Sequence, residues 1–296
     1  MTAVFHPSLA RIAGVALALA AIAPGTTVAA GNFNASFATF VDSENGQSLD
    51  LDLYWDATRW VSLAAGAGST DSASSLADLN GRSLRAAIDV HGDAVGARIG
   101  WRNWQDGDEF ESDVLNGEVY WRHAGWKLGL VGEQRDIDIG YSITLANRVL
   151  ERTLSFSGTG IGAEASWYGD AWGVYARSVV YDYDSALDRA IAASQQPNLA
   201  RFPRIQGLVA SLLTRTAGAI DNDLSVGVER SFKRSGLRLD LARSRDAISQ
   251  ADSTSASVAY RYTLTPRFEI EGTVGLTDTE SADSVSFAGI TLSLRN

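Results

Sequence analysis

The sequence contains no cysteine, only five prolines, and only two lysines, Lys127 and Lys233, among its 25 basic residues. The absence of cysteine excludes a disulfide framework and a metal site built on thiolates. Since 35 acidic residues give a net charge of -10, the chain also lacks the basic surface that nucleic-acid binding requires. Glycine and proline are too few and too irregular for a collagen-like chain, and 45% apolar residues are too many for a disordered one.

Long apolar runs are also missing, apart from one near the start of the chain. Residues 12–23 form a twelve-residue apolar run, which follows a segment with one positive charge and no acid and precedes small residues at 28–30. This is the layout of a secretory signal peptide. A membrane anchor is the alternative, but twelve residues at about 1.5 Å each cover only about 18 Å of a roughly 30 Å hydrocarbon core. We therefore expect a signal peptide over residues 1–30 and a mature chain over residues 31–296.

The mature chain alternates apolar and polar residues with the period of two that is typical of β-strands. Leu49, Leu51 and Leu53, for example, alternate with Asp50 and Asp52. Because no later stretch is apolar enough to form a transmembrane helix, a soluble β-protein and a β-barrel remain. The pattern predicts about fourteen strands, each roughly the nine to eleven residues that a tilted membrane strand needs. The predicted ranges are 32–41, 48–55, 60–68, 82–91, 94–104, 113–122, 126–136, 153–167, 172–183, 222–232, 236–246, 253–262, 267–277 and 284–294.

The predicted connections alternate between two classes. Short turns such as 92–93 and 123–125 alternate with connections that are mostly longer and rich in Asp, Ser and Glu, such as 69–81 and 105–112. Outer-membrane β-barrels have short periplasmic turns, longer external loops and an even number of strands. The alternation therefore favours an all-β transmembrane antiparallel barrel, with both chain ends on the short-turn side.

Aromatic residues flank the short turns of this predicted barrel. Six of the eight tryptophans bracket three of the turns at the same spacing, and a tyrosine and a phenylalanine bracket a fourth. Rings at one level are typical of the aromatic girdle at a membrane interface, with cross-strand pairing in a soluble sheet as the alternative. The residues predicted for a periplasmic girdle are Trp55, Trp60, Trp121, Trp126, Trp167, Trp172, Tyr262 and Phe268.

At the last predicted strand the chain resembles the Gram-negative outer-membrane β-barrel superfamily, and the resemblance extends over residues 31–296. Gly289, Leu292 and Leu294 match the glycine and the paired apolar positions of the C-terminal signal that the barrel-assembly machinery reads in that superfamily. The chain departs from the signal at Phe287, where a polar residue is usual, and after it at Arg295-Asn296, where the signal commonly ends in an aromatic residue. The resemblance implies insertion by that machinery into the outer membrane, with lipid and lipopolysaccharide as partners, and it identifies no narrower family.

Charged residues recur on the strand face opposite to the apolar one. Since an Arg or Lys that faces lipid at mid-membrane costs about 2 to 4 kcal/mol, we expect this face to line the lumen. The residues fit both a structural lattice of arginine–carboxylate pairs and a track that guides solutes. The lumen-lining candidates are Asp50, Asp52, Arg85, Asp89, Arg98, Arg102, Glu118, Arg122, Glu164, Arg177, Glu229, Arg238, Asp240, Arg261, Glu269 and Glu271.

The longest connection, residues 184–221, falls on the external side. Apolar residues at helical spacing in 186–194 and 205–215 predict two helical pieces, which prolines separate. We expect this helical loop either to fold into the mouth as a constriction or plug, or to lie over the rim as a surface hairpin near lipopolysaccharide phosphates. The constriction candidates are Arg189, Arg201, Arg204 and Arg215.

Few residues suit catalysis. His91 and His123 flank short turns, whereas the resemblance implies that enzymes of this superfamily place a histidine near the outer leaflet or external mouth. Without a base beside a serine, a nucleophilic mechanism lacks its usual partner. The acid pair Glu269 and Glu271 shares a face, and we expect it to form salt bridges in the wall. We therefore predict no catalytic residue.

Metal binding has one candidate, an acidic loop. Its oxygen-bearing side chains, Asp106, Asp108, Glu109 and Glu111, suit Ca²⁺, although their spacing is not that of an EF-hand. A solvated acidic loop is the default interpretation. No other metal or cofactor is expected.

Three functions remain for the predicted barrel. The leading hypothesis is a porin-like channel, monomeric or trimeric, that passes small hydrophilic solutes by diffusion. A pore that exports a polysaccharide and a non-conducting structural or adhesion barrel, plugged by residues 184–221, are the alternatives.

Overall fold

The computed structural model describes residues 32–73, 78–107, 110–145, 148–184, 219–247, 250–280 and 283–296. The predicted signal peptide lies outside these residues. In the described part the regular structure is β-strand, and no helix there is long and apolar enough to cross a membrane. The strands are β1 (Phe33–Asp42), β2 (Gln47–Thr58), β3 (Val61–Ala73), β4 (Asp78–His91), β5 (Val95–Asp106), β6 (Phe110–His123), β7 (Trp126–Leu145), β8 (Arg148–Tyr168), β9 (Trp172–Tyr183), β10 (Ile220–Ser231), β11 (Ser235–Asp246), β12 (Asp252–Thr265), β13 (Phe268–Thr279) and β14 (Val285–Arg295).

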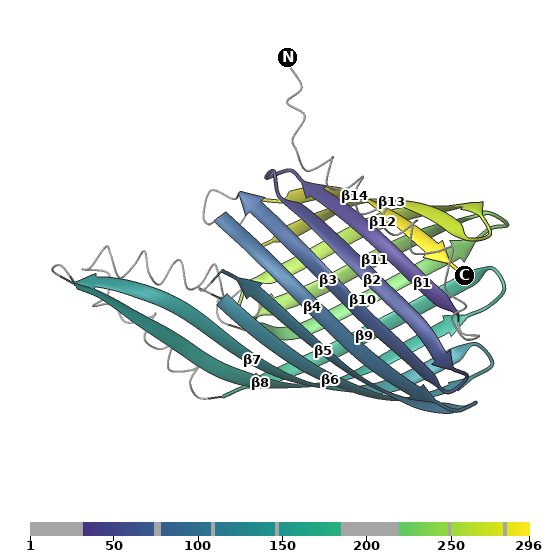
Figure 1. The fold of residues 1–296 in the computed structure, drawn as a ribbon, viewed down its shortest axis with the longest axis horizontal. Coiled ribbons are helices and arrows are strands. Elements are labelled where there is room, and N and C mark those ends of the chain that lie inside the picture. The colour runs from purple at the N-terminus through teal and green to yellow at the C-terminus, as the bar shows by residue number, and fades with distance from the viewer. Residues whose placement is uncertain are drawn as a thin grey trace, which may run out of the picture.

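These fourteen strands form one closed antiparallel barrel (Figure 1). Each strand pairs with its neighbours in sequence, and β1 closes the barrel by pairing with β14 from Asn34–Arg295 to Asp42–Phe287. Six connections of two or three residues lie at one end, together with both ends of the described chain, where the Asn296 N–H donates to the Phe33 carbonyl over 3.0 Å. The predicted strand number, antiparallel order and placement of the termini are thus confirmed.

The turn between β6 and β7 shows how tightly that end is closed. It consists of Ala124 and Gly125, whose φ angles are 51° and 83°. Two successive positive φ angles are the signature of a type I′ turn, whose twist matches that of the strands it joins. A side chain at Gly125 would also meet the backbone carbonyl of Tyr168. Glycine is therefore required here on two counts.

The outer surface of the barrel is apolar. Leu130 on β7 is 72% exposed and Ile161 on β8 is 79% exposed. On β4, the exposed Ile88 lies between the partly buried Ala87 and Asp89, so successive side chains alternate between the two faces. Each of the fourteen strands carries at least one large, exposed apolar residue, which is typical of a barrel that faces lipid. Apolar positions therefore point outward, as the alternation predicted.

The two faces exchange character toward the end that carries the longer connections. On the outward face of β7, the apolar Leu130 is followed by the exposed Asp136 and Asp138. On its inward face, Arg135 is followed by Ile139, which is fully buried. A wall with acids outside and apolar residues inside is the arrangement of a water-soluble sheet. The exchange therefore marks the level at which the barrel wall leaves the lipid.

This exchange explains why β7 and β8 are longer than predicted. The sequence pattern placed their outer ends at residues 136 and 153, but the strands extend to Leu145 and from Arg148. Their hairpin projects well beyond the rest of the barrel (Figure 1). Beyond Asp136 the apolar residues occupy the inward positions instead of the outward ones. A strand predicted from one unbroken alternation therefore ends at that residue. The predicted loop 69–81 is also too long, because β3 extends to Ala73 and β4 begins at Asp78. Only residues 74–77 lie outside these two strands.

We expect Leu130→Arg to destabilise the barrel by about 2 to 4 kcal/mol, because Leu130 lies in the apolar belt. Asp136→Arg, on the same outward face above the exchange, should change the stability by less than about 1 kcal/mol. Urea unfolding in phospholipid vesicles measures both. Equal losses would contradict the membrane level assigned here.

Inward-facing glycines lie beneath side chains that reach over them from the strands on either side. Gly96 on β5 lies under Tyr120 of β6, whose hydroxyl donates to Asp89 of β4 over 2.7 Å. Because a side chain at Gly96 would occupy the space of that ring, the glycine permits a bond between strands that are not neighbours. The same arrangement occurs at Gly66 beneath Arg85 and Asp52, at Gly227 beneath Tyr175 and its partner Asp240, and at Gly236 beneath Arg261 and its partner Glu229.

We expect Gly96→Val to destabilise the barrel by about 1 to 3 kcal/mol, the usual cost of overpacking, because it displaces the Tyr120 ring. Gly117→Val is the matched control, since Gly117 faces outward on β6 and no atom lies within 4 Å of its missing side chain. The urea midpoint of unfolding in detergent micelles measures the difference. If the two variants unfold at the same concentration, the glycine has no such role.

Candidate functional site in the lumen

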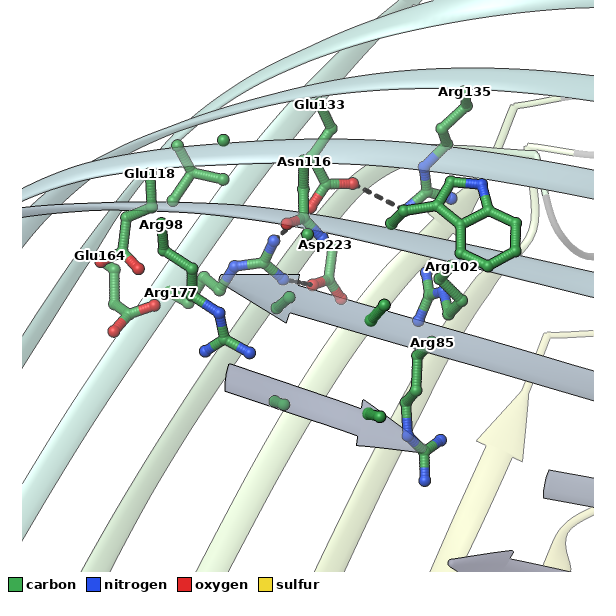
Figure 2. Close-up of a pocket in the computed structure, with 18 of the residues that line it drawn as sticks. Arg85, Arg98, Arg102, Asn116, Glu118, Glu133, Arg135, Glu164, Arg177 and Asp223 are labelled. Carbon is green, nitrogen blue, oxygen red and sulfur yellow. Dashed lines mark hydrogen bonds and ion pairs between the residues drawn. The ribbon is translucent and has the colours of Figure 1, made fainter. Parts of the chain in front are cut away.

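The barrel encloses a cavity of about 490 Å³ whose lining comes from β2 to β10. Figure 2 shows that most of the labelled side chains around it are charged, and they come from β4 to β10. The labelled polar residues of the lining are Arg85, Arg98, Arg102, Asn116, Glu118, Glu133, Arg135, Glu164, Arg177 and Asp223. The cavity is therefore a polar compartment inside an apolar belt.

Arg85 on β4 holds two acids of β2 across the intervening β3. Its Nε and Nη2 donate to the two carboxylate oxygens of Asp52 over 2.6 and 2.7 Å, and Nη2 also donates to Asp50 over 3.1 Å. A guanidinium that meets both oxygens of one carboxylate makes the strongest geometry of ion pair. This contact fixes the wall at β2 to β4.

Similar ion pairs continue around the barrel. In each of them a cation lies between two acids from the same or nearby strands, so that every acid is compensated. Lys127 contacts Glu118 over 2.6 Å and Glu164 over 2.9 Å, Arg238 contacts Asp240 over 2.9 Å and Glu271 over 3.1 Å, and Arg261 contacts Glu229 and, over 3.6 Å, Glu269.

Glu133 on β7 is the most buried acid of this network. Its side chain is 4% exposed and accepts hydrogen bonds from Arg177 and from the Tyr181 hydroxyl, the latter over 2.8 Å. Arg135 lies 3.3 Å from the same carboxylate and donates to the Tyr181 hydroxyl over 2.7 Å. Asp223 on β10 lies 3.9 Å from Arg177. A buried carboxylate with three donors is satisfied only while all its partners remain in place.

All sixteen charged residues expected in the lumen lie at inward-facing positions of their strands. Twelve of them belong to the ion pairs described above. Of the other four, Asp89 accepts the Tyr120 hydroxyl and Arg122 donates to the Gly92 carbonyl over 2.7 Å. Arg98 and Arg102 make no hydrogen bond or ion pair among the described residues. That these side chains guide a solute stays a prediction.

Sequence reasoning missed the tyrosines that complete this network. Tyr120, Tyr175 and Tyr181 point inward and each donates its hydroxyl to a lumen acid. It also missed Asp223, which lines the cavity. All four share the inward parity of their strands, so extending the parity rule from charged residues to tyrosines would have found three of them.

The residues predicted for the aromatic girdle lie near the short-turn end of the barrel. Trp121, Trp126 and Trp172 are 43 to 48% exposed on its outer surface, and the Trp126 ring lies 6.4 Å from that of Trp167. Trp60 lies in the turn before β3 rather than in the strand, with the Arg59 guanidinium 4.4 Å above its ring. Trp55, Tyr262 and Phe268 flank the same set of turns. That this level is a periplasmic membrane interface stays a prediction.

The acidic loop proposed for Ca²⁺ is divided between two faces of the wall. Asp106 is buried and accepts the Asn80 N–H over 2.9 Å, whereas Glu111 accepts the side-chain amides of Asn103 and Gln105 on the outward side. Asp108 and Glu109 lie outside the described residues. In the described part of the chain, no group of three or more acids or histidines is arranged to hold a metal ion. Calcium binding stays a prediction.

The two described histidines, His91 and His123, lie at the short-turn end of the barrel, as expected. His91 is the last residue of β4, and its Nδ1 lies 3.4 Å from Asp89. His123 is the last residue of β6, and its ring lies 5.8 Å from that of Trp121. Neither contact includes a serine. These surroundings are those of strand ends near an interface.

An apolar cluster, which sequence reasoning did not predict, fills part of the lumen at the opposite end. It joins inward-facing residues of β6, β7 and β8 to two connections of the barrel, and Trp104, Leu154 and Tyr183 pack against it. The cluster consists of Phe110, Ile137, Ile139, Phe156, Ala219 and Ala247. The sequence pattern assigned apolar residues to the lipid-facing side of the wall. It therefore did not predict apolar residues that face inward beyond the exchange of the two faces.

The cluster anchors the end of the long connection 184–221. Ala219 has no exposed surface, and its carbonyl accepts the Ala247 N–H over 2.7 Å. The Tyr183 hydroxyl donates to the Ile220 carbonyl over 3.0 Å. The constriction candidates Arg189, Arg201, Arg204 and Arg215 lie outside the described residues, so their role stays a prediction.

The chain matches no protein-family model and no curated protein. Solved structures that resemble it include OmpT, an outer membrane protein of Vibrio cholerae, with 9% identity, a TM-score of 0.47 and coverage of 92% of this chain and 99% of the other. The CymD monoaromatic hydrocarbon channel has 10% identity, a TM-score of 0.47 and coverage of 90% and 87%. The KdgM porin in complex with oligogalacturonate has 6% identity, a TM-score of 0.44 and coverage of 88% and 98%.

By its own closed topology and apolar outer belt, this chain has the fold of an outer-membrane β-barrel. These similarities concern the fold alone. The function of this barrel depends on the side chains of its own lumen.

We expect Glu133→Gln to destabilise the barrel by about 3 kcal/mol or more, because Arg135 and Arg177 then share no buried counter-charge. Glu271→Gln removes an acid that is 16% exposed and has one arginine partner, so it should cost less. Thermal unfolding of the two variants in the same detergent gives the comparison. Similar losses would show that burial of the Glu133 cluster is not what makes it important.

Proposed function

We propose that this chain is an outer-membrane channel that passes small hydrophilic solutes by passive diffusion. The observation that carries the proposal is a charged cavity of about 490 Å³ inside a closed barrel with an apolar belt. Selection in such a channel depends on the width and the charge of the lumen, with no chemical step. We accordingly propose no catalytic residue and no cofactor.

The proposal includes a route to the membrane. Residues 1–30 act as a signal peptide, and the barrel-assembly machinery inserts the chain through its last strand. Leu292 and Leu294 support this, because they lie on the outward side of β14, paired with Phe37 and Ala35 of β1. Lipid and lipopolysaccharide then surround the belt of the mature barrel.

A non-conducting structural barrel is the second candidate. It is favoured by the apolar cluster around Ile137 and Ile139, which occupies part of the lumen and holds one end of the long connection. A polysaccharide export pore is a third candidate, favoured by the inward-facing hydroxyls of Tyr120 and Tyr175, since sugars accept and donate hydrogen bonds.

The purified protein should insert into planar lipid bilayers and give stepwise conductance, because ions move through a hydrated, charged lumen. In liposomes, sugars of graded size should enter at rates that fall as their size rises. Heat-unfolded protein is the control. Current no greater than that of the control would overturn the channel and favour the non-conducting barrel, whereas selective block by long oligosaccharides would favour the export pore.

A further inference from the structure

β5 carries two arginines that form no ion pair with the described wall. Arg98 and Arg102 are both exposed within the lumen lining and make no hydrogen bond or ion pair with any described residue. The lumen cations Arg85, Lys127 and Arg177, by contrast, each contact at least one carboxylate. Arg122 also contacts no carboxylate, but it donates to a backbone carbonyl. The two β5 arginines therefore differ from these other lumen cations in having no hydrogen-bond or ion-pair partner among the described residues.

The acids beside Arg98 are already engaged. In the strand register, Arg98 lies opposite Asp89 of β4 and Glu118 of β6. Asp89 accepts the Tyr120 hydroxyl over 2.7 Å, and Glu118 contacts Lys127 over 2.6 Å. The nearest counter-charges thus have other partners, which leaves the Arg98 guanidinium directed into the cavity (Figure 2).

Arg102 has still less compensation. It lies directly opposite Arg85 on one side and Val114 on the other. Like charges directly opposite each other destabilise a sheet. Arg85 is neutralised by Asp50 and Asp52, whereas no acid lies directly opposite Arg102 in the strand register. Glu133 attracts Arg102 only at longer range and is already bound by Arg177. Two arginines opposite each other, with no acid opposite Arg102, do not stabilise the barrel wall.

We propose that Arg98 and Arg102 form an anion-binding site in the lumen, which takes small organic solutes with two or more carboxylate groups. The proposal rests on the channel function above and adds the class of solute. The two arginines are four residues apart on one face of β5, so their backbones are about 13 Å apart along the strand. Each guanidinium can hold a carboxylate through two hydrogen bonds, and together they contact a solute at successive depths of the lumen.

The first test is ion selectivity. Under a gradient of KCl across a planar bilayer, the wild-type channel should prefer chloride to potassium. Arg98→Gln with Arg102→Gln should reduce that preference about tenfold, the lower end of the effect of a cleft lined by one sign of charge. Arg82→Gln is the matched control, because Arg82 is exposed on the outward face of β4. An unchanged preference in the double variant would overturn the proposal.

The second test separates a binding site from a diffuse field. Citrate should block the KCl current of the wild-type channel more strongly than the uncharged sugar sucrose does. Arg98→Lys with Arg102→Lys keeps both charges but loses the planar fork, so it should keep the chloride preference and weaken the citrate block about tenfold. Equal block in this variant would overturn the site.

A binding measurement keeps the proposal testable if the channel does not conduct. Calorimetric titration of citrate into the detergent-solubilised protein should give heat with the wild type and with Arg82→Gln. The double glutamine variant should give none, after its folding has been checked by the shift of folded barrel on an unheated gel. A silent bilayer overturns the channel, whereas absent citrate heat with the folded wild type overturns the anion site.

Discussion

A chain that turns its apolar side chains toward lipid has to satisfy every polar group by itself. In hydrocarbon, an unpaired backbone N–H or carbonyl has no water to replace its partner, so an open sheet edge is excluded. Pairing of β1 with β14 removes both edges at once. The same constraint sends the charged residues inward, where they must neutralise one another. Closure and the charged lumen are thus two results of one requirement.

Neutralising those charges depends on where glycine occurs. Neighbouring inward-facing positions lie on adjacent strands, but many of the observed bonds join strands that are two apart, as in Tyr120 to Asp89 across β5. Such a bond needs space above the intervening strand, and Gly96 supplies it in this case because a side chain there would occupy the place of the Tyr120 ring. Outward-facing Gly117 and Gly132 have no atom near them, so they do not serve this purpose. The positions of inward glycines therefore help to decide which polar groups meet.

The sequence was sufficient for the strand number, the face that each strand turns to lipid and the end at which the termini lie, because these follow from a period of two. It was insufficient where the alternation continues but the inward positions change from charged to apolar, as between Arg135 and Ile139 on β7. The sequence also does not predict which residue each charged side chain contacts. Parity places Arg98 beside two acids, but only the three-dimensional arrangement shows that Tyr120 and Lys127 engage them first.

The exchange of polarity and the two uncompensated arginines lie next to each other on β5. Trp104, two residues beyond Arg102 on the same face, already packs against Phe110 of the apolar cluster, with ring centroids 5.0 Å apart. In the proposed channel, a solute that enters from the end with the longer connections would therefore leave apolar surroundings directly at Arg102 and reach Arg98 about four residues deeper. An anion that has lost part of its hydration there would meet a guanidinium that no described carboxylate contacts, and electrostatic attraction is strongest where water is scarce. The position of the two arginines, more than their number, makes them suited to select a solute.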